Sequence, residues 1–315
     1  MTANSEIAVV VVSYNTRDLL LECLTSVVDS ATGNAIELIV IDNASTDGSV
    51  EAIHRSFPES TIIANRSNRG FAAACNQGIQ ATGAAFVLLL NSDARLTQSA
   101  LTALRDCMSE ERCGAAGCRL VDATGVEQVS TMNFLTPFNQ ALELAGVSKG
   151  LGWRSLRRTC RPKTGGSARD CSVDWIEASC LLVRRTALDE VGLFDERFFM
   201  YSEDEDLCLR LRKNGWLVCF TDAGTAVHRG GASAELSRAE NLVHFYLSQM
   251  RFLLKHRSRA AVKLYTAANW ASLTLKRIFS NLKGRKQRVE ELSLRLVALK
   301  EASRLVVDCR LMINH

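Results

Sequence analysis

The chain has 315 residues, of which 47% are hydrophobic and only 3 are prolines, so its composition excludes a disordered or low-complexity protein. The net charge of +4 is uneven, because residues 1–250 hold 23 basic and 30 acidic side chains (−7) and residues 251–315 hold 15 and 4 (+11). We therefore expect a large α/β domain followed by a basic appendage.

The 11 cysteines are scattered singly through the chain without a paired CxxC motif, and most of them stand in apolar runs. Cys113 and Cys118 come nearest to a metal-binding pair, but no second pair accompanies them. We interpret the cysteines as reduced, buried residues of a cytoplasmic protein.

The N-terminus lacks the features of a signal peptide and no apolar run reaches the ~18 residues of a spanning helix, so we expect neither export nor a membrane span.

In chain order, the first part of the sequence alternates predicted strands and helices. Apolar runs predict buried strands at residues 7–12, 36–42, 61–64 and 84–93. A predicted helix follows each of the first three strands. The first covers residues 19–27, the second begins after the capping residues of NASTDGS and ends at Phe57, and the third begins after Gly70. This alternation predicts a mostly parallel sheet with helices on both faces, which binds its ligand at the carboxyl ends of the strands.

The middle of the chain has a weaker pattern. Residues 114–183 are less regular, their basic part at 154–170 is predicted to be a flexible loop, and strand character returns at 171–185. Residues 224–227 predict another strand, directly before a histidine. Beyond it, apolar residues at 242–253 have the spacing of an amphipathic helix, and helical segments follow to the end, so we place a domain boundary near residues 235–250.

Four consecutive acids at residues 203–206 begin a segment that is predicted to be a short helix ending before Gly215. Ser202 can cap this helix, and one or two carboxylates favour a helix N-terminus, but four exceed what capping requires. Mutual repulsion and burial beside the preceding aromatic residues are expected to raise the pKa of at least one carboxyl, as suits a general base. A solvated helix cap is the alternative interpretation.

Polar residues follow the predicted strands. No G-x-G-x-x-G motif is present there, which disfavours a nicotinamide-dependent dehydrogenase. Asp42 can accept a hydrogen bond from a pyrimidine ring or a ribose hydroxyl, whereas Asp47 or Ser45 fits the capping role better. Asp93 can share a cation with a diphosphate, with His228 as its partner, although a lone aspartate at a strand end is more often a cap and a lone histidine more often structural.

Seven stretches of the chain occur in this order: VVVVSYN, IVIDNASTDGS, NRGFAAACNQGI, LLLNSDARL, VDWIEASCLLVRR, VGLFDERFFMYSEDEDLCLRLRKNGW and VHRGGAS. Together they resemble an inverting glycosyltransferase of family 2 with the GT-A fold, and they are most similar to its rhamnosyltransferase-type members. The resemblance covers about residues 6–255. It implies an α/β fold with a GT-A type, mostly parallel sheet and a C-terminal helical appendage.

The resemblance also implies roles for single residues. Asp204 would be the catalytic base, and Asp93 and His228 would hold Mg²⁺ or Mn²⁺. The residues implied to bind the nucleotide and donor are Ser13, Tyr14, Asn15, Asp42, Asn43, Asn68, Gly70, Phe71, Asn76, Asn91 and Ser92. The residues placed on the acceptor side are Trp175, Glu177 and Glu203.

Two positions depart from the family pattern. Asn91 stands where many relatives have an acid, which would weaken metal binding. Ala178 and Ser179 stand where relatives often have Gly-Ala, with the unusual Glu177 beside them, so acceptor preference would differ.

The implied activity is transfer of a sugar with inversion, rhamnose from dTDP-rhamnose being the first candidate, to a saccharide or polyprenyl-diphosphate-linked acceptor in cell-surface polysaccharide or cell-wall glycan synthesis. A hexose or N-acetylhexosamine donor remains open, and so does a non-catalytic nucleotide-sugar-binding protein. We expect a catalytic domain at 1–240 and a basic, amphipathic helical region at 241–315. That region would pack on the catalytic domain or, through residues 251–310, contact anionic lipid at the inner face of the cell membrane. No nucleic-acid partner is expected, because no stacking platform or known motif is present.

Overall fold

The computed structural model describes residues 6–31, 35–144, 172–230 and 238–313. The chain divides into two compact units, which we call the sheet unit and the helical unit. The sheet unit contains the described strands and most of the helices between them, whereas the helical unit is built mainly from the C-terminal helices.

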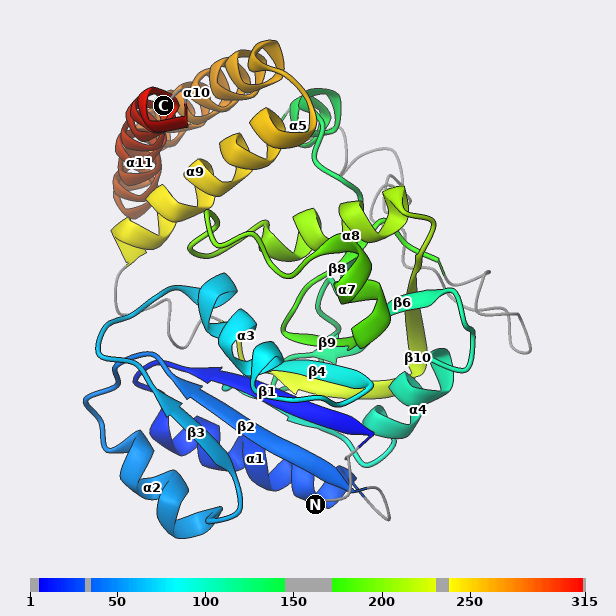
Figure 1. The fold of residues 1–315 in the computed structure, drawn as a ribbon. Coiled ribbons are helices and arrows are strands. Elements are labelled where there is room, and N and C mark those ends of the chain that lie inside the picture. The colour runs from blue at the N-terminus through cyan, green and yellow to red at the C-terminus, as the bar shows by residue number, and fades with distance from the viewer. Residues whose placement is uncertain (1–5, 32–34, 145–171, 231–237, 314–315) are drawn as a thin grey trace. The chain divides into compact units, whose positions relative to one another are not determined.

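Eight of the described strands form one sheet in the order β3-β2-β1-β4-β9-β6-β10-β5 (Figure 1). Their bounds are β1 (Ile7–Ser13), β2 (Ile36–Asp42), β3 (Thr61–Ala64), β4 (Phe86–Asn91), β5 (Ala94–Leu96), β6 (Cys113–Val121), β9 (Cys180–Arg184) and β10 (Leu217–His228). Strands β1 to β4 are parallel, β6 and β10 are parallel to each other, and β9 and β5 are antiparallel to their neighbours. A separate ribbon pairs β7 (Thr131–Met132) with β8 (Trp175–Ile176).

Helices cover both faces of this sheet, as predicted (Figure 1). On one face, apolar residues of α1 (Arg17–Ser30), α2 (Ser49–Ser56) and α4 (Ala100–Cys107) share a core cluster with alternate residues of β1. On the other face, α3 (Phe71–Gln80) lies so close that a Cβ at Gly78 would stand 2.3 Å from a methyl group of Val10. This α/β sheet confirms the predicted fold class, and the four N-terminal strands lie where the apolar runs predict them.

The weak pattern predicted from Gly114 onward was wrong for β6, which lies inside the sheet between β9 and β10. Its residues 114–117 are Gly and Ala, which give no strand signal. They are small because neighbours approach closely: a Cβ at Gly117 would lie 2.4 Å from Ile176 Cγ2. The sequence also gave no prediction of α4 or β5, and the basic loop predicted at 154–170 lies outside the described residues.

Two further helices complete the sheet unit. Helix α7 (Arg185–Val191) follows β9, and α8 (Glu203–Lys213) starts with the four acids. Helix α8 ends before Gly215, whose φ of +84° suits a residue without a side chain, so this predicted helix is confirmed.

The helical unit contains α5 (Pro137–Leu144), the segment Phe198–Ser202, α9 (Arg238–His256), α10 (Arg259–Leu282) and α11 (Lys286–Ile313). Its core joins buried residues of the three C-terminal helices with Leu135. Phe199 stacks on His244 with ring centroids 4.5 Å apart. The amphipathic helix predicted at 242–253 is confirmed by α9, but the unit also takes in earlier parts of the chain. None of the helices within the described ranges is both long enough and apolar enough to cross a membrane.

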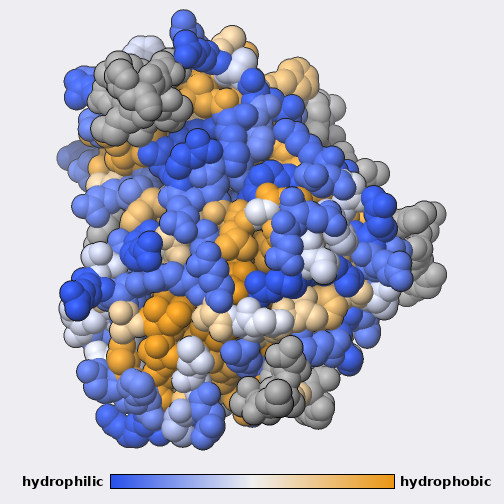
Figure 2. Space-filling model, viewed as in Figure 1, coloured by the Kyte–Doolittle hydropathy of each residue, from blue (hydrophilic) through white to orange (hydrophobic). Residues whose placement is uncertain are grey.

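Most of the surface seen in Figure 2 is hydrophilic, with apolar patches between the charged groups. None of the eight cysteines whose side chains the structure describes forms a disulfide, and seven of them are buried. The prediction of reduced, buried cysteines is therefore confirmed for this part of the chain.

Candidate active site

The topology brings the predicted ligand-binding residues to one edge of the sheet. In the parallel register, Ser13 at the end of β1 stands beside Asp42 at the end of β2, and Val12 stands beside Asn91 at the end of β4. The carboxyl ends of these three strands therefore meet, as expected for a ligand site in such a sheet.

At the end of β2, the Asp42 carboxylate is only half used. Its Oδ2 accepts a hydrogen bond from the backbone N–H of Ser45 at 2.9 Å, whereas its Oδ1 is buried and has no hydrogen-bond partner. Asn15, with a left-handed φ of 53°, fixes the facing loop through bonds to Ser45 and Thr46 at 2.9 and 2.8 Å. Tyr14 is half-buried beside it. The free Oδ1 is an acceptor ready for a donor group.

Asn43 ties this loop to the beginning of α3. Its Nδ2 donates to the Gly70 carbonyl at 3.1 Å, and its Oδ1 accepts from Asn65 at 2.9 Å. The Asn68 side chain in turn accepts from the Gly70 N–H at 2.9 Å, and Phe71 begins the helix. These hydrogen bonds hold the loop after β2 against the beginning of α3.

A chain of buried hydroxyls links the ends of β1 and β4. Ser13 Oγ lies 3.1 Å from Thr16 Oγ1, which lies 2.8 Å from Ser92 Oγ. Thr16 was not predicted, because nothing in its sequence context marks it as more than a helix-cap residue.

Asp93 and His228 come together although 135 residues separate them. The antiparallel register pairs His228 with Ala94, and Asp93 Oδ1 lies 3.3 Å from His228 Nε2. Asn91 Nδ2 is 3.4 Å from the same nitrogen. On the other side of the ring, Gln128 Oε1 lies 3.2 Å from Nδ1, and Gln128 Nε2 donates to the His228 carbonyl at 2.9 Å. Gln128 lies in a loop without a motif, so the sequence did not single it out.

Burial alone would lower the pKa of His228, but the hydrogen bond and charge of Asp93, together with the charge of Glu177, raise it above its ordinary value. The pair fits a divalent cation, because it joins an imidazole nitrogen with a carboxylate oxygen and Gln128 orients the ring. Within the described ranges, no three His, Cys, Asp or Glu side chains converge as metal ligands. The chain would thus supply two ligands and leave the others to phosphate and water.

The four acids of α8 are all buried, with 0% to 6% exposure. Asp204 Oδ2 accepts from the Ala178 N–H at 3.1 Å, and Oδ1 accepts from the Glu205 N–H at 2.8 Å. Burial raises the pKa of Asp204 to about 7, the charge of Glu177 adds to this shift, and the two N–H groups oppose it. Asp204 is thus a firmly held carboxylate that can take up a proton near neutral pH.

Glu177 interacts electrostatically with both Asp93 and Asp204. Burial raises its pKa, His228 opposes this shift, and Asp93 adds to it. Burial and the charge of Asp204 raise the pKa of Glu203 well above its ordinary value, and Glu203 Oε2 is buried without a partner. Trp175 donates its indole N–H to the Asn133 carbonyl at 3.1 Å.

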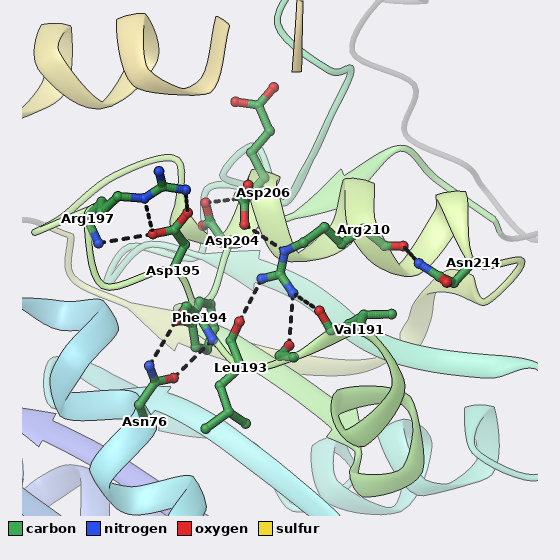
Figure 3. A network of polar contacts seen from close by, with 12 residues as sticks. Asn76, Val191, Leu193, Phe194, Asp195, Arg197, Asp204, Asp206, Arg210 and Asn214 are labelled. Carbon is green, nitrogen blue, oxygen red and sulfur yellow. Dashed lines mark hydrogen bonds and ion pairs between the residues drawn. The ribbon is translucent and has the colours of Figure 1, made fainter. Parts of the chain in front are cut away.

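A polar network holds α8 against the preceding loop (Figure 3). The Arg210 guanidinium pairs with Asp206 at 2.8 Å and donates to the carbonyls of residues 191–193 at 2.7 to 2.8 Å. Asn76 donates to the Phe194 carbonyl at 2.9 Å and accepts from its N–H at 3.0 Å. Asn76, predicted beside the donor, therefore uses its amide to hold this loop.

Two residues directly before α8 have left-handed backbones without being glycine. Tyr201 has a φ of 70° and Ser202 a φ of 61°. This conformation is unfavourable for residues with a side chain, so the surrounding structure must hold it in place.

A separate surface hollow of about 580 Å³ is lined by α1, the loop after β2, and α2. Arg17, Ser45 and Arg55 are among its residues, and none of the predicted site residues lines it. Most of the predicted residues instead form three groups: the ends of β1 and β2, the Asp93 and His228 pair, and the acids of α8 with Glu177.

Comparison with known proteins gives one family. Residues 8–191 match the family described as "Glycosyl transferase family 2". A relative from Mycobacterium tuberculosis, an N-acetylglucosaminyl-diphospho-decaprenol L-rhamnosyltransferase, is 31% identical over 79% of this chain and 84% of its own length. A Haloferax volcanii hexosyltransferase of low-salt glycan biosynthesis, Agl10, is 22% identical over 80% of this chain and 76% of its own.

A solved structure has the same fold. The mannosyltransferase PcManGT from Pyrobaculum calidifontis, in complex with GDP-Man and Mn²⁺, aligns with a TM-score of 0.57 at 18% identity, covering 97% of this chain and 88% of that one. The sheet and its helices are therefore arranged as in this sugar-nucleotide-bound protein.

Proposed function

Because this chain belongs to glycosyl transferase family 2, we propose that it transfers a sugar from a nucleoside diphosphate donor to an acceptor hydroxyl, with inversion at the anomeric carbon. Rhamnose from dTDP-rhamnose is the first candidate donor, and a polyprenyl-diphosphate-linked saccharide of cell-wall or polysaccharide synthesis is the first candidate acceptor. The name of the M. tuberculosis relative supports rhamnose as the sugar and a diphospho-decaprenol-linked saccharide as the acceptor. The hexosyltransferase relative keeps a hexose donor as the alternative.

The nucleoside would bind at the ends of β1 and β2. The unpartnered Oδ1 of Asp42 supports this position, because a ring N–H or ribose hydroxyl would supply its missing hydrogen bond. Tyr14, Asn15 and the Asn43 loop would form the surrounding wall.

Asp93 and His228 would hold Mg²⁺ or Mn²⁺ beside the donor diphosphate. The 3.3 Å approach of their side chains supports this proposal, as does the Mn²⁺ bound in the structural neighbour. Such an ion supplies positive charge that stabilises the departing diphosphate.

Asp204 would act as the general base. It takes the proton of the acceptor hydroxyl as the hydroxyl oxygen forms a bond to the anomeric carbon, and the bond from that carbon to the diphosphate breaks. One displacement from the face opposite the leaving group inverts the configuration. Glu177 and Glu203, buried near Asp204, would contact the acceptor. A raised pKa on an anchored carboxylate is the observation that carries this proposal.

The decisive experiment measures release of nucleoside diphosphate from a panel of nucleotide sugars with Mn²⁺ or Mg²⁺ and lipid-linked or saccharide acceptors. We expect release from one donor class in the parent protein, a loss of at least a hundredfold in Asp204→Asn, and a comparable loss in Asp93→Ala. The exposed acid Asp222 provides a matched control, since Asp222→Asn should keep full activity.

Binding of the nucleotide sugar without release from any donor would contradict the proposal and favour a non-catalytic binder.

We further propose that residues 1–240 carry the chemistry and residues 241–315 form an accessory helical part. We propose a cytoplasmic site of action, because the eight cysteines whose side chains the structure describes form no disulfide.

A further inference from the structure

Helix α10 exposes an apolar line along one side. The line consists of Leu264, Ala268, Ala271, Leu275, Ile278 and Leu282. These residues recur every three or four positions, which places them on one face of the helix. The four large side chains are 48% to 76% exposed, and Phe279 beside them is 61% exposed. At 1.5 Å per residue the line is roughly 27 Å long.

This line is not the face that holds the helical unit together. Val262, Tyr265 and Leu273 point into the core that α10 shares with α9 and α11, and they are at most 6% exposed. Helix α10 therefore carries a second apolar face that its own unit does not bury, and five of the 11 large exposed apolar residues of the described chain lie on or beside this face.

The charges around the line have one sign. Helix α10 contains the basic residues Arg259, Lys263, Lys276 and Arg277 and no Asp or Glu, and Lys283 follows directly. An apolar stripe flanked only by cations matches a surface that is apolar inside and negatively charged at its border.

We propose that this face of α10 binds an anionic lipid bilayer, with the helix lying in the plane of the interface. A second copy of the chain fits the face less well, because a symmetric contact would bring the same basic flanks together. The bilayer instead buries the leucines at the acyl boundary and places the lysines among the phosphate head groups. The link to a lipid-linked acceptor rests on the proposed function, whereas the binding itself does not.

The test uses the full chain and flotation with two kinds of vesicle, pure phosphatidylcholine and an equal mixture of phosphatidylcholine and phosphatidylglycerol. We expect binding to the anionic vesicles that weakens with added salt. Leu275→Ser with Leu282→Ser should lower the partition coefficient at least tenfold. Lys276→Gln with Lys283→Gln should lower it roughly 25-fold, because each basic residue contributes about fivefold.

Matched controls come from the exposed surface of α11, where Val297→Ser with Lys300→Gln should leave vesicle binding unchanged. All variants replace exposed side chains, and thermal melts should confirm that they stay folded. Equal binding of parent and α10 variants would overturn the proposal. So would a dimer, detected by light scattering, that the leucine variants dissociate. Donor hydrolysis without vesicles reports on the proposed function separately, and the α10 variants should retain it.

Discussion

At the scale of single residues, Asp204 sets the expected pH dependence of transfer. The base must be ionised, and burial raises the pKa of Asp204 to about 7. The ionised fraction therefore falls as pH falls below about 7, by about tenfold per pH unit, and levels off above it. The measurement is kcat against pH at saturating donor and acceptor. A profile that stays flat from mildly acidic to mildly alkaline pH would contradict the role of Asp204.

Gln128 should tune the cation site without touching the nucleotide. It contacts both Nδ1 and the carbonyl of His228, so Gln128→Ala would free the ring to rotate. We expect Mn²⁺ affinity to fall by about 10- to 100-fold, with nucleoside binding in the absence of metal unchanged. Calorimetric titration with Mn²⁺ and nucleoside diphosphate measures this directly. The exposed Gln80 offers a control, since Gln80→Ala should bind Mn²⁺ like the parent.

At the scale of elements, Arg210 positions α8. Arg210→Met would remove the guanidinium that pairs with the fully buried Asp206 and would release the carbonyls of residues 191–193. We expect a loss of about 3–5 kcal/mol in the free energy of unfolding, with a lower kcat because α8 carries Asp204. Urea denaturation and initial rates provide the two readouts.

The pair of Arg197 with the partly buried Asp195, in the same loop, is the matched control for this change. Because the Arg197 side chain is 61% exposed, Arg197→Met should reduce stability by at most about 1 kcal/mol. Equal losses in the two variants would show that the Arg210 network does not stabilise the fold more than a surface pair does.

At the scale of the whole molecule, the helical unit draws on three parts of the chain. Its core includes Leu135, and its aromatic contacts include Phe199 with His244. Truncation after residue 240 would therefore remove the helices on which the earlier segments pack. We expect the truncated protein to aggregate and to show no cooperative thermal transition. Scanning calorimetry and dye binding test this expectation. A truncated chain that melts as sharply as the full one would contradict it.

The sequence predicted the parts of this fold that follow a strong local pattern. The apolar run of β1 and the polar residues at the ends of β1, β2 and β4 were readable, because strand direction alone gathers them. Strand β6 could not be predicted, because its Gly and Ala residues are required by close contacts with residues that are distant in sequence. The same holds for Asn76, whose partner Phe194 lies 118 residues away, and for Gln128. The run of four acids and His228 drew attention by their local context, but the choice of Asp204 among the four acids came from family resemblance, because no local pattern distinguishes it from its neighbours.

The left-handed backbones of Tyr201 and Ser202 determine which substitutions at these positions could make the protein more stable. Each such residue is held at a cost of roughly 1–2 kcal/mol relative to a relaxed backbone, in a molecule whose whole stability is on the order of 10 kcal/mol. Glycine at Ser202 would remove that cost, whereas glycine at Tyr201 would also remove the edge-on ring contact with Phe245. A substitution directly before α8 could therefore stabilise the protein. A more flexible backbone at this point would, however, fix the direction of α8 less firmly.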